Sequence, residues 1–240
     1  MPYPIAPPPP DRATLGLDAV IDLSRSVTVT DFRAVRRSNI LGVVHKATEG
    51  GDYLDTAYAG RRPQAEAAGL LWGAYHFGTG QTPGARQAAY FLSVARPGRR
   101  TLLALDLEAN ENNPGNSMRL DQAEEFVQAV AAATGRLPVV YVHPTWANGD
   151  PLPNSNLSLG ARITPDSIVA RCGLWIADYH DSPEVPIAWE QTGWRLWQYA
   201  GDESESKPAY GQTSIVSGVS HCDRNLFNGD ASELQRFWGA

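Results

Sequence analysis

Apolar runs of strand length alternate with helix-like segments through the first 143 residues of the chain. The helix-like segments are expected at 31–37, 57–69, 83–96 and 120–135, and the runs that they separate are expected at 17–22, 41–47, 70–77, 102–105 and 138–143. Strands that alternate with helices of this length form βα units, in which the strands pair in parallel through right-handed crossovers. The sequence therefore predicts an α/β fold built around a parallel sheet.

The helical pattern weakens after the fifth run. Residues 147–160 are rich in Asn, Pro and Gly and predict a long loop, while 164–171 and 232–238 could form further helices. Three more apolar runs follow, at 174–179, 194–199 and 219–226, with spacers too rich in Pro, Gly and Ser for helices. Eight strands of this kind indicate a single barrel of parallel or near-parallel strands whose last third has lost its helical cover.

Composition limits the class of partner. A chain of 240 residues suffices for one sizeable core, and its net charge of −6 offers no basic field for nucleic acid or an anionic membrane. No segment approaches the ~18 apolar residues of a membrane span. Residues 1–16 form a Pro-rich leader that we expect to be extended; it lacks the basic and apolar regions of a Sec signal. Cys172 and Cys222 are predicted to be free thiols, because they lie two strands apart around a barrel.

Two acids stand at the end of the most apolar strand. Residues 102–105 are apolar without alternation, as in a parallel strand buried on both faces. Asp106 and Glu108 follow it two residues apart, so both carboxyls leave the same side of the chain. Active sites of parallel α/β folds are built at this end of the strands. We interpret the pair as a candidate acid–base site rather than as caps of the next turn.

Further polar and aromatic residues are predicted at the other strand ends. They are Asp22, Glu49, His76, His143, Asp178 and Asp223, with Tyr75, Tyr141, Trp146, Tyr179, Trp197 and Tyr199 nearby. Carboxylates among aromatics suit glycoside hydrolysis: one acid must stay protonated to serve the leaving oxygen, and a second negative group must stabilise positive charge at the anomeric carbon. We expect Glu49, His45 and His76 to be structural and leave His143 and Asp178 open. Lys46 is interpreted as an ion-pair partner of an acid, ahead of direct substrate contact.

Seven short motifs occur in order along the chain. They are Ile21–Ser24, Lys46–Gly50, Gly73–Phe77, Leu105–Glu108, Leu174–Tyr179, Trp197–Tyr199 and Asp223–Asn225. Together they resemble glycoside hydrolase family 25, the N-acetylmuramidase lysozymes, over about residues 17–238. The resemblance implies a single-domain, TIM-like (β/α)5(β)3 barrel at 17–240. It also implies cleavage of the β-1,4 bond between N-acetylmuramic acid and N-acetylglucosamine in a peptidoglycan glycan strand.

The resemblance also assigns roles to residues. It implies that Glu108 is the proton donor, that Asp106 assists the substrate N-acetyl group with net retention, and that Asp22 and Asp223 complete the acidic site. It places Tyr75, Tyr141, Tyr179 and Trp197 at the substrate, and we include Lys46 among the candidate substrate-binding residues. No cofactor or metal is expected, and the partner is peptidoglycan rather than nucleic acid or membrane. We expect a monomer that acts on the bacterial cell wall, in the periplasm or outside the cell, by an export route that the sequence does not identify.

The chain also departs from the family pattern. Many relatives carry Gln-Gly a few residues after the first motif, whereas Ser24 is followed here by Arg-Ser-Val-Thr-Val-Thr, and the stretches 147–160 and 201–216 have no evident counterpart. These departures leave the predicted acids in place. They bear on the shape of the groove and therefore on fine specificity.

Other functions compete with this reading. A metal-dependent barrel hydrolase needs converging histidines, but neither H-x-H nor H-E-x-x-H occurs. A peptidoglycan-binding module without turnover has no need of both Asp106 and Glu108. A chitinase-like barrel would carry a longer D-x-x-D-x-D-x-E run, and Ala104 stands where one of its acids would be.

Overall fold

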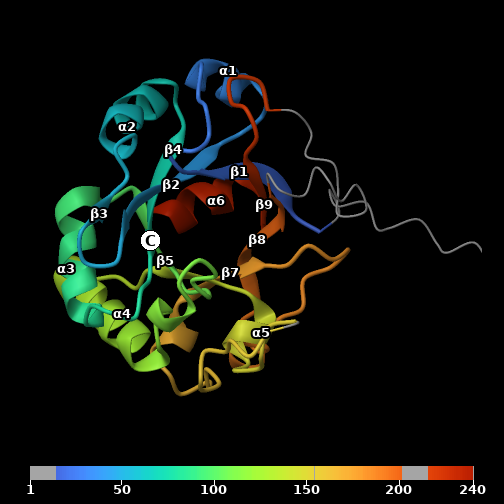
Figure 1. The fold of residues 1–240 in the computed structure, drawn as a ribbon. Coiled ribbons are helices and arrows are strands. Elements are labelled where there is room, and N and C mark those ends of the chain that lie inside the picture. Colours follow the sequence, from blue (N-terminus) through green and yellow to red (C-terminus); the bar gives the residue numbers. More distant parts are fainter. Residues whose placement is uncertain (1–14, 154, 202–215, 240) are drawn as a thin grey trace, which may run out of the picture.

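Eight strands hydrogen-bond to one another in a closed ring (Figure 1). The computed structural model describes residues 15–153, 155–201 and 216–239. Around the ring the strands follow the order β1 (Leu17–Leu23), β2 (Gly42–Glu49), β4 (Leu71–Phe77), β5 (Thr101–Asp106), β6 (Val139–Val142), β7 (Gly173–Ala177), β8 (Trp194–Ala200) and β9 (Asp223–Phe227), which returns to β1. The expected single-domain α/β barrel is confirmed.

The last strand runs against its neighbours, which corrects the expectation of eight parallel or near-parallel strands. Within the ring, each pair of neighbouring strands from β1 round to β8 is parallel. β9 pairs antiparallel with both β8 and β1. A parallel pair needs a crossover, usually a helix, and the described residues between β8 and β9 contain no helix. Because β9 is reversed, its first residue, Asp223, lies at the same end of the barrel as Asp22, with which it pairs.

Helices cover the first part of the ring (Figure 1). They are α1 (Phe32–Arg37), α2 (Tyr58–Ala67), α3 (Gly84–Ala95) and α4 (Leu120–Thr134), and the fifth, α5 (Pro144–Ala147), is a single turn. The expected cap of α1 is present, since the Asp31 side chain accepts a hydrogen bond from the backbone N–H of Arg33. The suggested helix at 164–171 is only a 3-10 turn at Val169–Arg171. The C-terminal α6 (Ala231–Trp238) forms as predicted.

A short strand changes the region after β2. β3 (Tyr53–Leu54) pairs antiparallel with Thr48 and Glu49 and was not expected. β2 thus extends through Glu49, two residues beyond the run expected at 41–47. Thr48 to Leu54 therefore form a hairpin at one edge of the barrel mouth.

The hydrophobic core has two layers. Alternate strand residues fill the inside of the barrel, among them Val20, Val44, Leu102, Ala104, Val139, Trp175, Leu196 and Phe227. α6 closes the end of this interior with Leu234 and Trp238, whose indole N–H donates to the carbonyl of Trp72 at 2.9 Å. The opposite strand faces pack against the helices. The polar site therefore has to lie at the other end of the barrel.

Some earlier expectations concern residues outside this description. Residues 1–14 of the leader and 202–215 of the long stretch at 201–216 lie outside the described residues. Cys172 and Cys222 are described and are buried free thiols, and burial raises the pKa of each to about 12. Within the three described ranges, no helix is long and apolar enough to cross a bilayer.

Candidate active site

The barrel mouth lies directly above the hydrophobic interior. On β5, Leu102 and Ala104 fill the barrel, and Asp106 and Glu108 follow in the same two-residue phase. The same alternation brings side chains from other strands to this level. Asp106 and Glu108 line a polar cavity of about 120 Å³ with Asp22, Tyr75, Tyr141, Trp175, Gln198 and Asp223. All four predicted acids thus meet in one place, with two of the predicted tyrosines.

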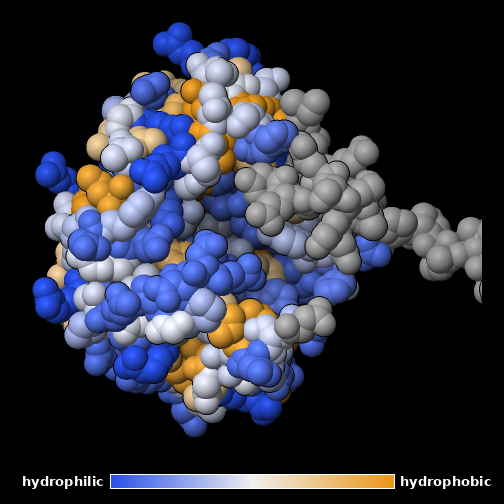
Figure 2. All heavy atoms as spheres, viewed as in Figure 1, coloured by the Kyte–Doolittle hydropathy of each residue, from blue (hydrophilic) through white to orange (hydrophobic). Residues whose placement is uncertain are grey.

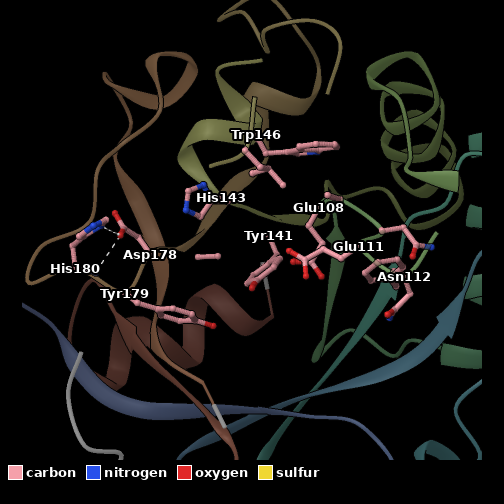
Figure 3. Close-up of a pocket in the computed structure, with 14 residues that line it drawn as sticks. Glu108, Glu111, Asn112, Tyr141, His143, Trp146, Asp178, Tyr179 and His180 are labelled. Atoms are coloured by element: carbon pink, nitrogen blue, oxygen red, sulfur yellow. Dashed lines mark hydrogen bonds and ion pairs between the residues drawn. The ribbon is translucent and has the colours of Figure 1, made fainter. Parts of the chain in front are cut away.

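A wider cleft of about 540 Å³ adjoins this cavity, and Glu108 and Tyr141 line both. Figure 2 shows hydrophilic residues around the hollow in the middle of this face. In Figure 3, Glu108, Glu111 and Asn112 lie on one side of Tyr141, whereas His143, Asp178, Tyr179 and His180 lie on the other. The arrangement is a groove with an acidic cavity in its floor, which suits an extended polar chain.

The two central acids retain protons unusually well. Burial raises the pKa of Glu108 to about 7, the negative charge of Glu111 acts in the same direction, and Lys46 opposes both. Burial and then the charge of Glu108 hold the pKa of Asp106 well above its ordinary value. The Oδ1 atom of Asp106 is buried and accepts no hydrogen bond from any described residue. The pair therefore keeps a proton near neutral pH, and one of its carboxyl oxygens has no hydrogen-bond partner among the described residues.

Lys46 forms an ion pair, as the sequence suggested. Its Nζ lies 2.7 Å from Oε2 of Glu49, and 4.9 and 5.2 Å from the ring centres of Phe77 and Tyr53. Phe77 belongs to the wall of the cleft. The ammonium group is therefore held at the edge of the site, where its charge lowers the pKa of both Asp106 and Glu108.

A hydrogen-bond network surrounds Asp22. Its Oδ2 accepts from Nε2 of Gln198 at 3.0 Å and from Nδ2 of Asn225 at 2.8 Å. Oε1 of Gln198 accepts from the hydroxyls of Tyr141 (2.8 Å) and Tyr179 (2.9 Å). The indole N–H of Trp175 donates to Oδ1 of Asn225 at 2.6 Å. The predicted Asp22, Tyr141 and Tyr179 are thus joined through two amides.

Sequence reasoning missed both amides and Trp175. Gln198 and Asn225 lie inside motifs that were quoted for the family resemblance, but neither was singled out. For Asn225 the available signal was phase, since it stands two residues after Asp223; Gln198 stands two residues after Leu196, which only the structure shows to be interior. Glu111 was also missed, since a loop carries no such periodic signal.

The predicted histidines and Asp178 fall into two groups. His76 is buried between Thr48 (2.8 Å) and Gln87 (3.0 Å), and His45 between the carbonyl of Lys46 and Arg61, so both are structural as expected. His143 and Asp178 both line the cleft. Burial lowers the pKa of His143, and the buried Asp178 carboxylate accepts from the backbone N–H of Glu184 at 2.8 Å.

Trp197 does not reach the site, and its predicted substrate contact is wrong. Its side chain is fully buried in the outer core cluster, between the rings of Trp194 and Tyr199. Its indole N–H donates to the carbonyl of Asp178. The reason is strand alternation: because Gln198 takes the inner face of β8, its neighbour Trp197 must point outward.

Replacing Trp197 with alanine is therefore expected to destabilise the fold. Loss of a fully buried indole leaves a cavity, so the free energy of unfolding should fall by about 3–5 kcal/mol. Denaturant titration measures this change, with Leu54→Ala, at a side chain that is 44% exposed, as the control. Unchanged stability combined with weaker sugar binding would show instead that Trp197 contacts the substrate at the cleft.

Within the described ranges, no three His, Cys, Asp or Glu side chains are grouped so as to hold a metal ion.

A closed barrel with protonatable carboxylates at its mouth and a polar groove above them is the architecture of a barrel glycoside hydrolase. Comparison with known proteins agrees with this class. The chain belongs to the glycosyl hydrolases family 25, whose family model matches residues 21–207. It is a glycoside hydrolase of the lysozyme and muramidase type.

Individual relatives span nearly the whole chain. "Lysozyme M1" of Streptomyces globisporus is 29% identical over 244 aligned positions, which cover 94% of this chain and 74% of the relative. An N,O-diacetylmuramidase of Arthroderma benhamiae is 26% identical, with 90% and 84% covered. The crystal structure of a bacterial lysozyme from Streptomyces coelicolor superposes with a TM-score of 0.74 at 29% identity, covering 93% and 97% of the two chains.

Proposed function

We propose that this enzyme is a muramidase that cleaves the β-1,4 bond between N-acetylmuramic acid and N-acetylglucosamine in peptidoglycan. The observation that carries the proposal is the pair Asp106 and Glu108 at the floor of the groove, which holds a proton near neutral pH. A binding module without turnover would gain nothing from a protonated carboxyl in this position. The relatives named as lysozyme and N,O-diacetylmuramidase support the same substrate.

In the proposed reaction, Glu108 is the general acid and base. Its proton passes to the glycosidic oxygen as the C–O bond breaks, while the carbonyl oxygen of the substrate's own N-acetyl group bonds to the anomeric carbon. The Glu108 carboxylate then takes a proton from water, whose oxygen attacks the same carbon and releases the N-acetyl oxygen. Two displacements at one carbon give net retention of configuration.

Asp106 is the partner of the N-acetyl group in this proposal. In the reaction its Oδ1 accepts a hydrogen bond from the amide N–H as positive charge develops on the amide, and the absence of a partner for this atom among the described residues supports that role. Asp22 and Asp223, which line the same cavity, add negative charge that stabilises the cationic transition state. Tyr75 and Tyr141 line the cavity, Tyr179 lines the cleft, and Lys46 stands at its edge.

Digestion of purified peptidoglycan tests this function. Soluble products should carry N-acetylmuramic acid at their new reducing ends, and proton NMR at early times should detect the β-anomer first. Products that end in N-acetylglucosamine would contradict the bond assignment, and an initial α-anomer would contradict retention. Gel filtration of the same preparation tests the accompanying proposal that the enzyme acts as a monomer at the cell wall.

A further inference from the structure

Gln198 joins the predicted catalytic acids to the aromatic wall of the groove. It is 3% exposed, lines the acidic cavity, and is the only side chain in the described network bonded to both Asp22 and the tyrosines. Its strand neighbour Asn225 meets it in register across β8 and β9. We propose that Gln198 is a positioning residue of the hydrolase, which fixes Asp22 as an anion and fixes the donor direction of Tyr141 and Tyr179. This inference rests on the proposed function.

The direction of the Gln198 amide follows from the chemistry of its partners. An ionised carboxylate can only accept hydrogen bonds, so the NH₂ group of Gln198 must face Asp22 and its carbonyl must face the phenols. The opposite orientation would place two acceptors 3.0 Å apart. Tyr141 therefore has to donate its single hydroxyl proton to Gln198, and only its lone pairs remain for a ligand.

Asn225 is oriented by the same logic. The indole N–H of Trp175 can only donate, so it requires the carbonyl of Asn225, whose NH₂ group then faces Asp22. Two N–H donors thus converge on one oxygen of Asp22. Hydrogen bonds to the charged form of a carboxyl stabilise that form. The two donors therefore favour the charged form of Asp22, which leaves the proton of the site on the Asp106 and Glu108 pair.

This division of charge matters because the same cavity holds several titratable groups. Those that face Asp22 and Gln198 are Tyr75, Tyr141, Asp106, Glu108 and Asp223, with Tyr179 bonded through Gln198. The charge on Asp22 raises the pKa of both Asp106 and Glu108, and Lys46, paired with Glu49, lowers both. If Asp22 took up the proton instead, the site would lose negative charge that stabilises the transition state.

The test replaces Gln198 with methionine, which keeps the length and flexibility of the side chain but removes its hydrogen bonds. We expect kcat on peptidoglycan to fall about 10²-fold, as for loss of one preorganised electrostatic group, with little change in KM. In proteins labelled with ¹³C at aspartate carboxyls, Asp22 should protonate about one pH unit higher in Gln198→Met than in the wild type. That shift corresponds to loss of one hydrogen bond to a charged group.

Three controls separate the outcomes. Gln235→Met, on the exposed side of α6, should change neither kcat nor the Asp22 titration. An unchanged Asp22 titration in a folded Gln198→Met protein, or a rise in KM alone, overturns the inference. If that variant does not fold, Tyr141→Phe with Tyr179→Phe releases the Gln198 carbonyl while keeping both rings, and Asp22 should shift in the same direction; no shift overturns the inference. Wild-type protein that fails to hydrolyse peptidoglycan refutes the proposed function instead.

Discussion

Glu108→Gln is expected to reduce peptidoglycan hydrolysis by about 10³–10⁴-fold, at the upper end of what a general acid contributes. Glutamine has nearly the same shape as glutamic acid but cannot deliver a proton to the glycosidic oxygen. Turbidity clearance of peptidoglycan suspensions measures the rate, and binding of soluble muropeptides should stay close to wild type. Glu190→Gln, at an exposed position, is the matched control. Wild-type clearance by Glu108→Gln would refute the assignment of the acid.

A further prediction concerns how activity and stability depend on pH. Because the pKa of Glu108 is raised to about 7, wild-type activity should fall as pH rises through this value and the acid loses its proton. The folded state binds this proton more tightly than the unfolded chain does. Its contribution to stability is therefore complete below the ordinary pKa of glutamic acid and is lost as pH rises through about 7. Glutamine does not titrate, so the Tm of Glu108→Gln relative to wild type should rise between pH 4 and pH 8.

The strand that carries the acids could be predicted from sequence because its signals are local. An apolar run without alternation identifies a strand buried on both faces, and a spacing of two residues places Asp106 and Glu108 on one side. The same two arguments located the cavity, since the carboxyl ends of parallel strands meet at one end of a barrel. No long-range information was needed for this part of the site.

Features that depend on register or strand direction were not predictable in this way. Trp197 and Gln198 are adjacent, and which of them faces the barrel is decided by how β8 pairs with β7 and β9. An aromatic residue in a short sequence motif carries no information about its face. The reversal of β9 is likewise a matter of long-range strand pairing, and it brings Asp223 to the mouth from the start of a strand rather than from its end.

Asp106→Asn tests the proposed role of Asp106 towards the N-acetyl group. This variant is expected to lose less activity than Glu108→Gln. Asparagine keeps the volume and one carbonyl acceptor for the substrate amide, but it removes the charge that stabilises the N-acetyl group as it becomes cationic. We expect kcat to fall by about 10²–10³-fold with little change in KM, because the lost interaction strengthens only in the transition state. Asp166→Asn, in an exposed loop, is the control.

A substrate comparison separates this role from a simple effect of charge. If Asp106 acts through the N-acetyl group, glycan chains whose N-acetyl carbonyl is made a weaker nucleophile by trifluoroacetylation should be cleaved more slowly by wild type. Asp106→Asn should lose much of that sensitivity, because the assisted attack is already impaired. The unpartnered Oδ1 of Asp106 in the floor of the groove motivates this expectation. Equal sensitivity of the two proteins to trifluoroacetylation would show that Asp106 acts independently of the N-acetyl group, as an electrostatic neighbour of Glu108 alone.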